Sequence, residues 1–241
     1  MHIIYGVCFY FGSYRKQNII DHIQIFKDLC STFSEHTFDF CITCMIDESD
    51  PNKRQIETLR LYEDFNELKN IKCTLLHNFN SSGTLQGLDD LFTHFNTDEY
   101  KNSYVFFFEE DFLPINLLFL NDSIDLLKSD EYIYIGESTT GKIKSVDSRP
   151  THSKDRLCRL YNSNTEVWTD GGYYATTIKR LQKVKEKLGD FHIGNKTTKY
   201  EKVLDGVDYG EVGFPTRLHH EGFVFKPLFR RNYFVHYEKR N

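Results

Sequence analysis

Apolar and polar residues alternate in two patterns through the first half of the chain. Short apolar runs predict strands at 2–11, 38–47, 71–78 and 103–111. Between these runs apolar residues recur every three or four positions, which predicts helices at 16–33, 52–69 and 83–95. Because strands that alternate with helices pair in parallel through right-handed crossovers, we expect an α/β fold, a three-layer sandwich around a mainly parallel central sheet.

The second half of the chain is less regular. Its pattern predicts a helix at 115–129, a strand at 131–138, a Lys-rich helix near 178–188 and a closing strand at 229–238. Residues 139–166 instead form a polar segment rich in Lys, Arg, Ser and Thr. A loop of this length is typical of a functional lid or of a solvated surface excursion, and both interpretations stay open. With no internal repeat or low-complexity tract, we expect one domain over residues 1–241.

Composition narrows the class of protein. Aromatic residues make up 15% of the chain and only 5 residues are Pro, which favours a packed core over a disordered or fibrous chain. The net charge of −5 and the lack of a long basic run argue against nucleic acid as a general partner. No apolar stretch reaches the ~20 residues of a membrane span, and the opening apolar run lacks the basic region of a signal peptide.

We therefore expect a soluble, cytoplasmic protein, and the cysteines agree with a reducing compartment. Five of the six cysteines lie inside predicted strands and helices, Cys158 falls in the polar segment, and the six lack the spacing of a disulfide scaffold. Cys41 and Cys44 form a C-x-x-C pair, but residues three apart on a strand point to opposite faces, so we interpret both as structural. The abundance of Asn, Lys, Ile, Phe and Tyr would suit an AT-rich viral or microbial genome; for a virus, the cytoplasm would be that of the host cell.

The predicted strand at 103–111 ends in the sequence FFFEED, so three carboxylates directly follow three phenylalanines. Adjacent carboxylates repel one another and are costly to remove from water unless a cation lies close to them. Ligands of parallel α/β sheets bind at the carboxyl ends of the strands, which is where these acids fall. Because Mg²⁺ and Mn²⁺ prefer oxygen ligands, the run predicts a divalent-cation site, with a hydrated strand-to-loop junction as the alternative.

Several motifs occur in the order known from one enzyme family. Three motifs include the ends of the second, third and fourth predicted strands: CMIDESD, NFNSSGTLQGLDDLF and YVFFFEEDFLP. Three more occur in the second half: TDGGYYATT, GEVGFPTRLHHEGF and YFVHYE. In this order they resemble the GT-A fold of nucleotide-sugar glycosyltransferases, especially the inverting, family-2-like members. The resemblance implies a metal-dependent enzyme that moves a sugar from a nucleotide diphosphate donor to a hydroxyl of a glycan or glycoconjugate.

The resemblance makes residues 1–111 the half of the domain that binds the nucleotide sugar. The donor-binding residues that it implies are Asp47, Asn78, Asn80, Gly83, Glu109, Glu110 and Asp111. Asp47 would lie near the base or ribose. Mn²⁺ or Mg²⁺ would be held by Asp111, Glu109 and His236. On a strand Glu109 and Asp111 point to one side, so we expect Asp111 to bind the metal directly and Glu109 to bind the ribose or a metal-bound water. Glu110 would face the acceptor or solvent.

The resemblance makes residues 112–241 the acceptor-binding half. Glu211 falls on the family's catalytic-base position, where it would take the proton of the acceptor hydroxyl, and Asp208 is the alternative base. The residues implied in acceptor binding are Trp168, Asp170, Gly171 and Gly172. Arg230 and Arg231, on the predicted closing strand, would either pair with phosphate or be solvated charges at the edge of the sheet.

The chain departs from the family pattern at three positions. Glu109 and Glu211 stand where the family carries aspartate, and Gly210 replaces an acid. Three alternatives to an inverting transferase therefore remain: a retaining GT-A transferase, a sugar nucleotidyltransferase that releases pyrophosphate, and a glycan-binding domain without turnover. The chemistry of a leaving diphosphate, which gathers negative charge as the C1–O bond breaks, is common to inverting and retaining glycosyltransferases.

Overall fold

A computed structural model describes residues 1–11, 16–79, 83–138, 144–146, 166–168, 170–191 and 213–237. Its centre is a seven-stranded sheet of order β10-β6-β9-β4-β1-β2-β3. In chain order these strands are β1 (His2–Tyr10), β2 (Thr37–Ile46), β3 (Cys73–Phe79), β4 (Tyr104–Glu109), β6 (Tyr132–Ser138), β9 (Asp170–Thr177) and β10 (Val224–Phe229). Every pairing is parallel except those of β9, which runs antiparallel to both β4 and β6. The predicted mainly parallel α/β sheet is confirmed.

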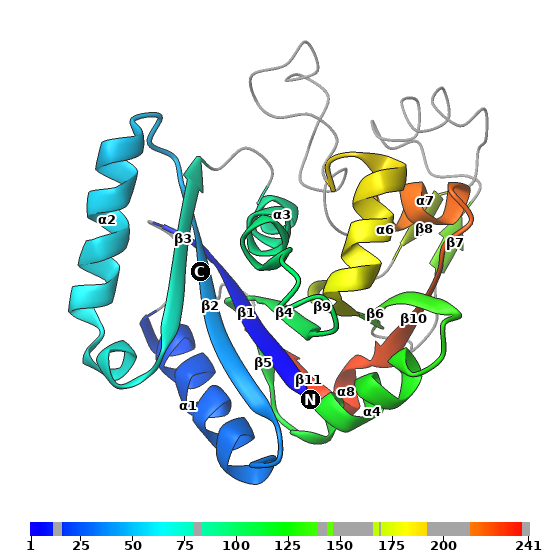
Figure 1. The fold of residues 1–241 in the computed structure, drawn as a ribbon, viewed down its shortest axis with the longest axis horizontal. Helices are drawn as coiled ribbons and strands as arrows, with labels where there is room; N and C mark the ends of the chain where they lie inside the picture. Colours follow the sequence, from blue (N-terminus) through cyan, green and yellow to red (C-terminus); the bar gives the residue numbers. More distant parts are fainter. Residues whose placement is uncertain are drawn as a thin grey trace.

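Helices cover both faces of this sheet, which gives the expected three layers (Figure 1). The helices are α1 (Lys16–Thr32), α2 (Pro51–Asp64), α3 (Thr84–Phe95), α4 (Leu118–Leu127), α6 (Ile178–Leu188), α7 (Gly213–His220) and α8 (Arg230–Tyr233), with the 3₁₀ helix η1 (Asn66–Asn70) after α2. Two antiparallel pairs lie outside the sheet, β5 (Phe112–Pro114) with β11 (Phe234–His236) and β7 (Lys144–Val146) with β8 (Glu166–Trp168). None of the described helices is long and apolar enough to cross a membrane.

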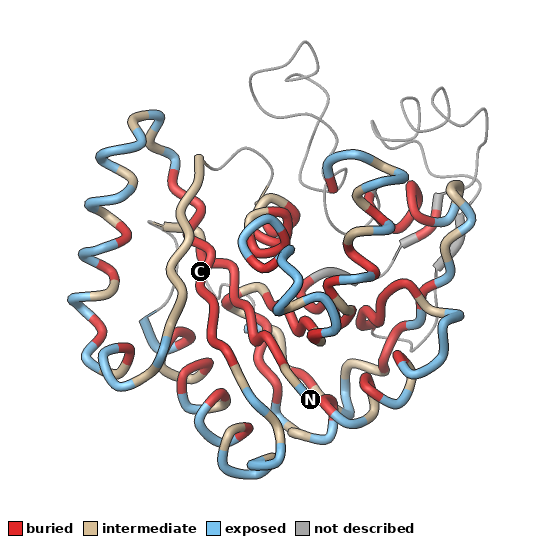
Figure 2. Tube along the Cα trace, in the orientation of Figure 1, coloured by how far each residue is buried: buried red, intermediate tan, exposed pale blue. Residues whose placement is uncertain are grey.

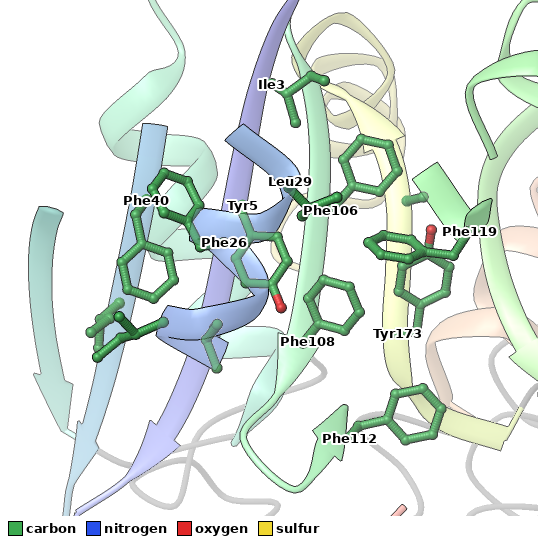
Figure 3. Close-up of a cluster of buried hydrophobic side chains, with 14 of the residues drawn as sticks. Ile3, Tyr5, Phe26, Leu29, Phe40, Phe106, Phe108, Phe112, Phe119 and Tyr173 are labelled. Atoms are coloured by element: carbon green, nitrogen blue, oxygen red, sulfur yellow. The ribbon is translucent and has the colours of Figure 1, made fainter. Parts of the chain in front are cut away.

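Alternate residues of each strand feed two separate cores. Tyr5 and Phe108 belong to the core beneath α1, α4 and the β5–β11 pair, whereas Ile4 and Phe107 belong to the core beneath α3, α6 and α7. The central strands are buried along most of their length, while the outer helices show one buried face (Figure 2). The first core is largely aromatic, with rings from several elements in mutual contact (Figure 3).

Two segments differ from the sequence-based prediction. The helix expected at 52–69 stops at Asp64, because Phe65 takes an extended backbone conformation and buries its ring, and the 3₁₀ helix η1 follows. The closing strand expected at 229–238 is three short elements, β10, α8 and β11. The helical turn of α8 separates the two strands and directs Arg230 toward β6, where it meets a buried carboxylate.

The cysteines behave as predicted. Cys41 and Cys44 are buried in opposite cores, so the C-x-x-C pair converges on neither a metal nor a disulfide. The described cysteines are free thiols.

Two glycines, one on α3 and one on β1, allow helix α3 to pack closely against the sheet. A Cβ atom at Gly87 of α3 would lie 2.5 Å from Oγ1 of Thr43, and one at Gly6 of β1 would lie 2.5 Å from Cδ1 of Leu91. Real Cβ atoms do not approach other atoms so closely, so each glycine is needed where it stands. The close contact fixes the first turn of α3 beside the end of β4.

Candidate functional site

The acidic run forms a turn that is held by its backbone. β4 ends at Glu109, and Glu110 and Asp111 lead into β5. The backbone N–H of Glu110 donates to the carbonyl of Cys8 at 3.1 Å, and that of Tyr237 donates to the carbonyl of Asp111 at 2.8 Å. We call Glu109–Asp111 the acidic turn. Strand alternation beyond Glu109, on which the expected orientation of the three acids rested, does not apply to a turn.

Glu109 is bound by the first residue of α3. The Thr84 hydroxyl donates to Oε1 of Glu109 at 2.5 Å, and the Tyr10 hydroxyl lies 2.6 Å from the same Thr84 oxygen. Because the Thr84 proton is directed at the carboxylate, the Tyr10 hydroxyl is the donor of the second bond. Neither Thr84 nor Tyr10 is predicted by the sequence pattern, because the role of each depends on how closely α3 packs against the sheet.

Gly83, a predicted donor-binding residue, precedes this contact. It caps α3 with a φ of 60°, a conformation that favours glycine, and a Cβ atom there would lie 2.8 Å from the Tyr10 hydroxyl oxygen. Glycine at this position therefore allows α3 to begin directly beside Tyr10 and Glu109.

Glu110 does not face solvent, which corrects one of its two expected placements. Its side chain is buried, with Oε2 3.5 Å from the backbone nitrogen of Tyr10. The backbone of the turn carries this side chain inward, under the end of β1, instead of outward as a continuing strand would.

Asp111 meets the predicted metal ligand His236. Nε2 of His236 lies 3.4 Å from Oδ2 of Asp111, and about a third of each side chain is exposed. The hydrogen bond to Asp111 raises the pKa of His236, an effect that partial burial opposes. Glu109 raises the pKa further by its charge and Arg230 lowers it, which shows that all four groups lie within electrostatic reach of one another.

A buried ion pair borders the same region. The guanidinium of Arg230 binds the carboxylate of Glu137 through two hydrogen bonds, of 2.8 and 2.6 Å, and also lies over the Phe112 ring. Glu137, at the end of β6, is fully buried. Arg230 is therefore not a solvated charge at the edge of the sheet. Its partner Glu137 was not predicted from the sequence.

The predicted acceptor segment begins at the same edge of the sheet. Because β9 is antiparallel to β4 and β6, its first residues lie where those strands end. Asp170 is the register partner of Glu137, and Tyr173 that of Phe108, so Gly172 lies beside the start of the acidic turn. Gly172 has a φ of 97°, and a Cβ atom there would lie 2.7 Å from the Phe112 ring. Gly171 lies between Asp170 and Gly172 in β9, and Trp168 ends β8.

The other predicted donor residues lie further along the sheet edge. Asp47 follows β2 directly and is exposed. The Asn78 side chain, on β3, donates to Oδ1 of Asp90 at 2.9 Å and accepts from the backbone nitrogen of Phe79 at 2.8 Å. Asn80, Asp208 and Glu211 lie outside the described residues.

The donor set around the acidic turn suits a hard divalent cation. Among the residues that the structure describes, no group of three or more His, Cys, Asp and Glu side chains forms a ready-made metal site. Asp111 and His236 are nevertheless in contact and partly exposed, with Glu109 close by. Arg230 is bound to Glu137. Carboxylate and imidazole groups are ligands that Mn²⁺ accepts, so these residues fit the predicted ion.

Comparison with known proteins adds solved structures of related architecture. No protein-family model matches the chain, and no curated protein matches it either. Mouse xyloside xylosyltransferase 1 in its apo form aligns at a TM-score of 0.42 and 9% identity, over 95% of this chain and 85% of that one. Mannose-6-phosphate isomerase from Helicobacter pylori aligns at 0.45 and 17%, over 78% and 77%.

A mannosyltransferase from Pyrobaculum calidifontis, in complex with GDP-Man and Mn²⁺, aligns at a TM-score of 0.38 and 14% identity, over 78% of this chain and 47% of that one. All three TM-scores are below 0.5 and the activities differ. The residues of this chain are therefore the only basis for the function proposed below.

Proposed function

We propose that the chain is a metal-dependent glycosyltransferase of the GT-A type, which moves a sugar from a nucleotide diphosphate donor to a hydroxyl of a glycan or glycoconjugate. One observation carries the proposal. Asp111 lies against His236 beside Glu109, at the carboxyl edge of the sheet where β9 starts with Asp170. Candidate metal ligands and the candidate acceptor segment thus share one edge, as a transfer between two substrates requires.

In this proposal Asp111 and His236 hold Mn²⁺ or Mg²⁺, and Glu109 binds the ribose or a metal-bound water. When bound, the cation supplies positive charge that neutralises the departing diphosphate as a Lewis acid. Thr84 orients Glu109 by donating to its Oε1 atom, and Tyr10 in turn orients the Thr84 hydroxyl. Arg230 borders the same region, but its charge is offset by its ion pair with Glu137.

The other substrate contacts remain proposals from the sequence. Asp47, Asn78, Asn80 and Gly83 would contact the donor, and the segment from Trp168 to Gly172 would bind the acceptor sugar. Glu211, or Asp208 in its place, would take the proton from the attacking hydroxyl. A base on the face opposite the leaving group gives inversion at C1, whereas a retaining enzyme would not use Glu211 in this way.

The test is a thermal-shift screen of nucleoside diphosphates and nucleotide sugars, each with and without Mn²⁺. A ligand that binds only the folded chain increases the free energy of unfolding by RT ln(1 + [L]/Kd), and the melting temperature rises as a result. We expect nucleotide sugars to raise it only when Mn²⁺ is present. Turnover of the best donor should release free nucleoside diphosphate.

The products separate the alternatives. Release of pyrophosphate would indicate a nucleotidyltransferase, and NMR of the product anomer distinguishes inversion from retention. Metal-dependent binding without any donor hydrolysis or transfer would favour the non-catalytic glycan-binding domain. No metal-dependent response to any nucleotide sugar would overturn the proposal.

A further inference from the structure

A buried histidine on α1 contacts the acidic turn from below. His22 is fully buried, and its Nδ1 atom lies 2.8 Å from the Tyr5 hydroxyl of β1. Its Nε2 atom lies 3.2 Å from the backbone carbonyl oxygen of Glu110. The two ring nitrogens therefore connect the central strand β1 with the middle residue of the acidic turn.

The chemistry of the partners fixes the direction of both bonds. A carbonyl oxygen only accepts, so Nε2 carries the proton, and Nδ1 accepts from the Tyr5 hydroxyl. Burial lowers the pKa of His22 to about 3 and raises that of Tyr5 well above its ordinary value. Neither group ionises near neutral pH, so the orientation of this Tyr5–His22–Glu110 chain does not change with ordinary variations of pH.

The rings of Tyr5 and His22 also pack against Phe108, the residue that precedes the acidic turn. The Phe108 ring lies 4.9 Å from the ring of Tyr5 and 5.8 Å from that of His22, measured between centroids. Figure 3 shows Tyr5 beside Phe108, with Phe119 and Tyr173 further along the core. The side chain of Phe108 and the carbonyl of Glu110 are thus both in contact with His22, on either side of Glu109.

An apolar side chain would fill the same volume without the cost of burying a polar imidazole. We propose that His22 is a positioning residue: by binding the Glu110 carbonyl it holds Glu109 and Asp111 in the arrangement that accepts a divalent cation. This inference rests on the proposed function, since it assigns His22 a role in the same metal site. Tyr5 supports it by fixing the tautomer of the imidazole.

The experiment measures binding of Mn²⁺ alone, by the loss of the free-ion EPR signal, to the wild-type chain and to variants. His22→Leu removes both hydrogen bonds. His22→Gln keeps an amide donor for Glu110 and an oxygen acceptor for Tyr5. The matched control is Tyr173→Phe, which removes the buried 2.7 Å hydrogen bond to Ser123 in the same core but leaves the turn untouched. Melting temperatures of all variants are recorded beside the affinities.

We expect His22→Leu to weaken Mn²⁺ binding about tenfold, about the effect of one lost hydrogen bond. His22→Gln should bind Mn²⁺ nearly as tightly as the wild type, and so should Tyr173→Phe despite its lower melting temperature. If His22→Leu does not fold, Tyr5→Phe replaces it, with an expected loss of about threefold because the imidazole is then free to change tautomer.

The outcomes distinguish the two proposals. Wild-type chain that binds no Mn²⁺ overturns the metal site and this inference with it. Wild-type chain that binds Mn²⁺, together with a His22→Leu or Tyr5→Phe variant of unchanged affinity, overturns the positioning role alone. An equal loss of affinity in Tyr173→Phe would reduce His22 to an ordinary core residue.

Discussion

Nε2 of His236 lies 3.4 Å from Oδ2 of Asp111, which joins β11 to the turn that ends β4. Asp111 is the main reason that the pKa of His236 is raised. A histidine whose pKa is higher in the folded chain than in the unfolded chain stabilises the fold below the unfolded value, near 6.5, and loses this effect as the pH rises through the raised pKa. The pair therefore links stability, pH and the candidate metal site.

Replacing Asp111 by Asn should change three measurements together. The pKa of His236, followed by NMR titration, should fall toward its ordinary value. The melting temperature should drop more at pH 6 than at pH 9, because protonated His236 loses its partner. The Mn²⁺-dependent thermal shift with nucleotide sugars should disappear. Asp125→Asn, which alters an exposed ion pair with Lys128, is the control. A mutant that responds to Mn²⁺ as strongly as the parent would exclude Asp111 as a ligand.

Replacing Thr84 by Val should lower the free energy of unfolding by about 1–3 kcal/mol, because Tyr10 and Glu109 lose the hydroxyl that joins them. Valine keeps the shape of threonine, so packing changes little. Thr84→Ser retains the hydroxyl and should lose less than half as much. Urea unfolding of the three proteins measures the difference. A Val variant as stable as the wild type, or a Ser variant that loses as much as Val, would contradict a dominant role of the hydroxyl.

Replacing Arg230 by Met should destabilise the chain by about 3–5 kcal/mol, since the fully buried carboxylate of Glu137 loses its bidentate partner. The double variant Arg230→Met/Glu137→Leu should recover part of this loss, because it removes the uncompensated charge as well. Chemical denaturation of both single variants and the double variant gives the coupling energy. Strictly additive losses would show that the two side chains do not depend on each other.

The imidazole of His22 should remain neutral in the folded chain at pH 5, with the proton on Nε2. Its pKa of about 3 lies below the unfolded value near 6.5, so the unfolded chain binds more protons between these limits. Stability should therefore fall as the pH drops from 6.5 toward 3, and His22→Gln should reduce this acid sensitivity. The ¹⁵N chemical shifts of the imidazole nitrogens report whether His22 is neutral at pH 5 and which nitrogen carries the proton. A titration of His22 near pH 6 would contradict the expected neutral state.

Local patterns were sufficient to predict most of the fold. The strands and the long helices follow from apolar periodicity, which depends on residues within one element, and the capping Asp50 and Pro51 at the start of α2 are local signals as well. The short elements β5 and α8 were not predicted, because three or four residues are too few to establish a period. β11 lies within the closing strand expected at 229–238, whereas β9 and most of β10 were not predicted as strands. The end of α2 was not predicted either, because Phe65 leaves the helical conformation to bury its ring in the core.

The candidate site was only partly predictable for a related reason. The acidic run FFFEED is visible in the sequence, and so is its likeness to a family signature. The partners of these acids are not, because Thr84 and His22 each reach the acidic turn only when α3 and α1 pack against the sheet. The orientation of Glu110 was wrongly expected, since the alternation of a strand was extended into a turn.

The place of β9 in the sheet makes the two halves of the sequence interdependent. β9 inserts between β4 and β6, so the strand that carries Phe106–Phe108 completes its hydrogen bonding only after more than sixty further residues have been synthesised. A fragment truncated after Asp111 would expose this phenylalanine ladder along an unsatisfied edge, ready to associate with other chains. Assembly of the sheet edge that carries the candidate site should accordingly be a late, long-range event in folding rather than the property of an autonomous amino-terminal unit.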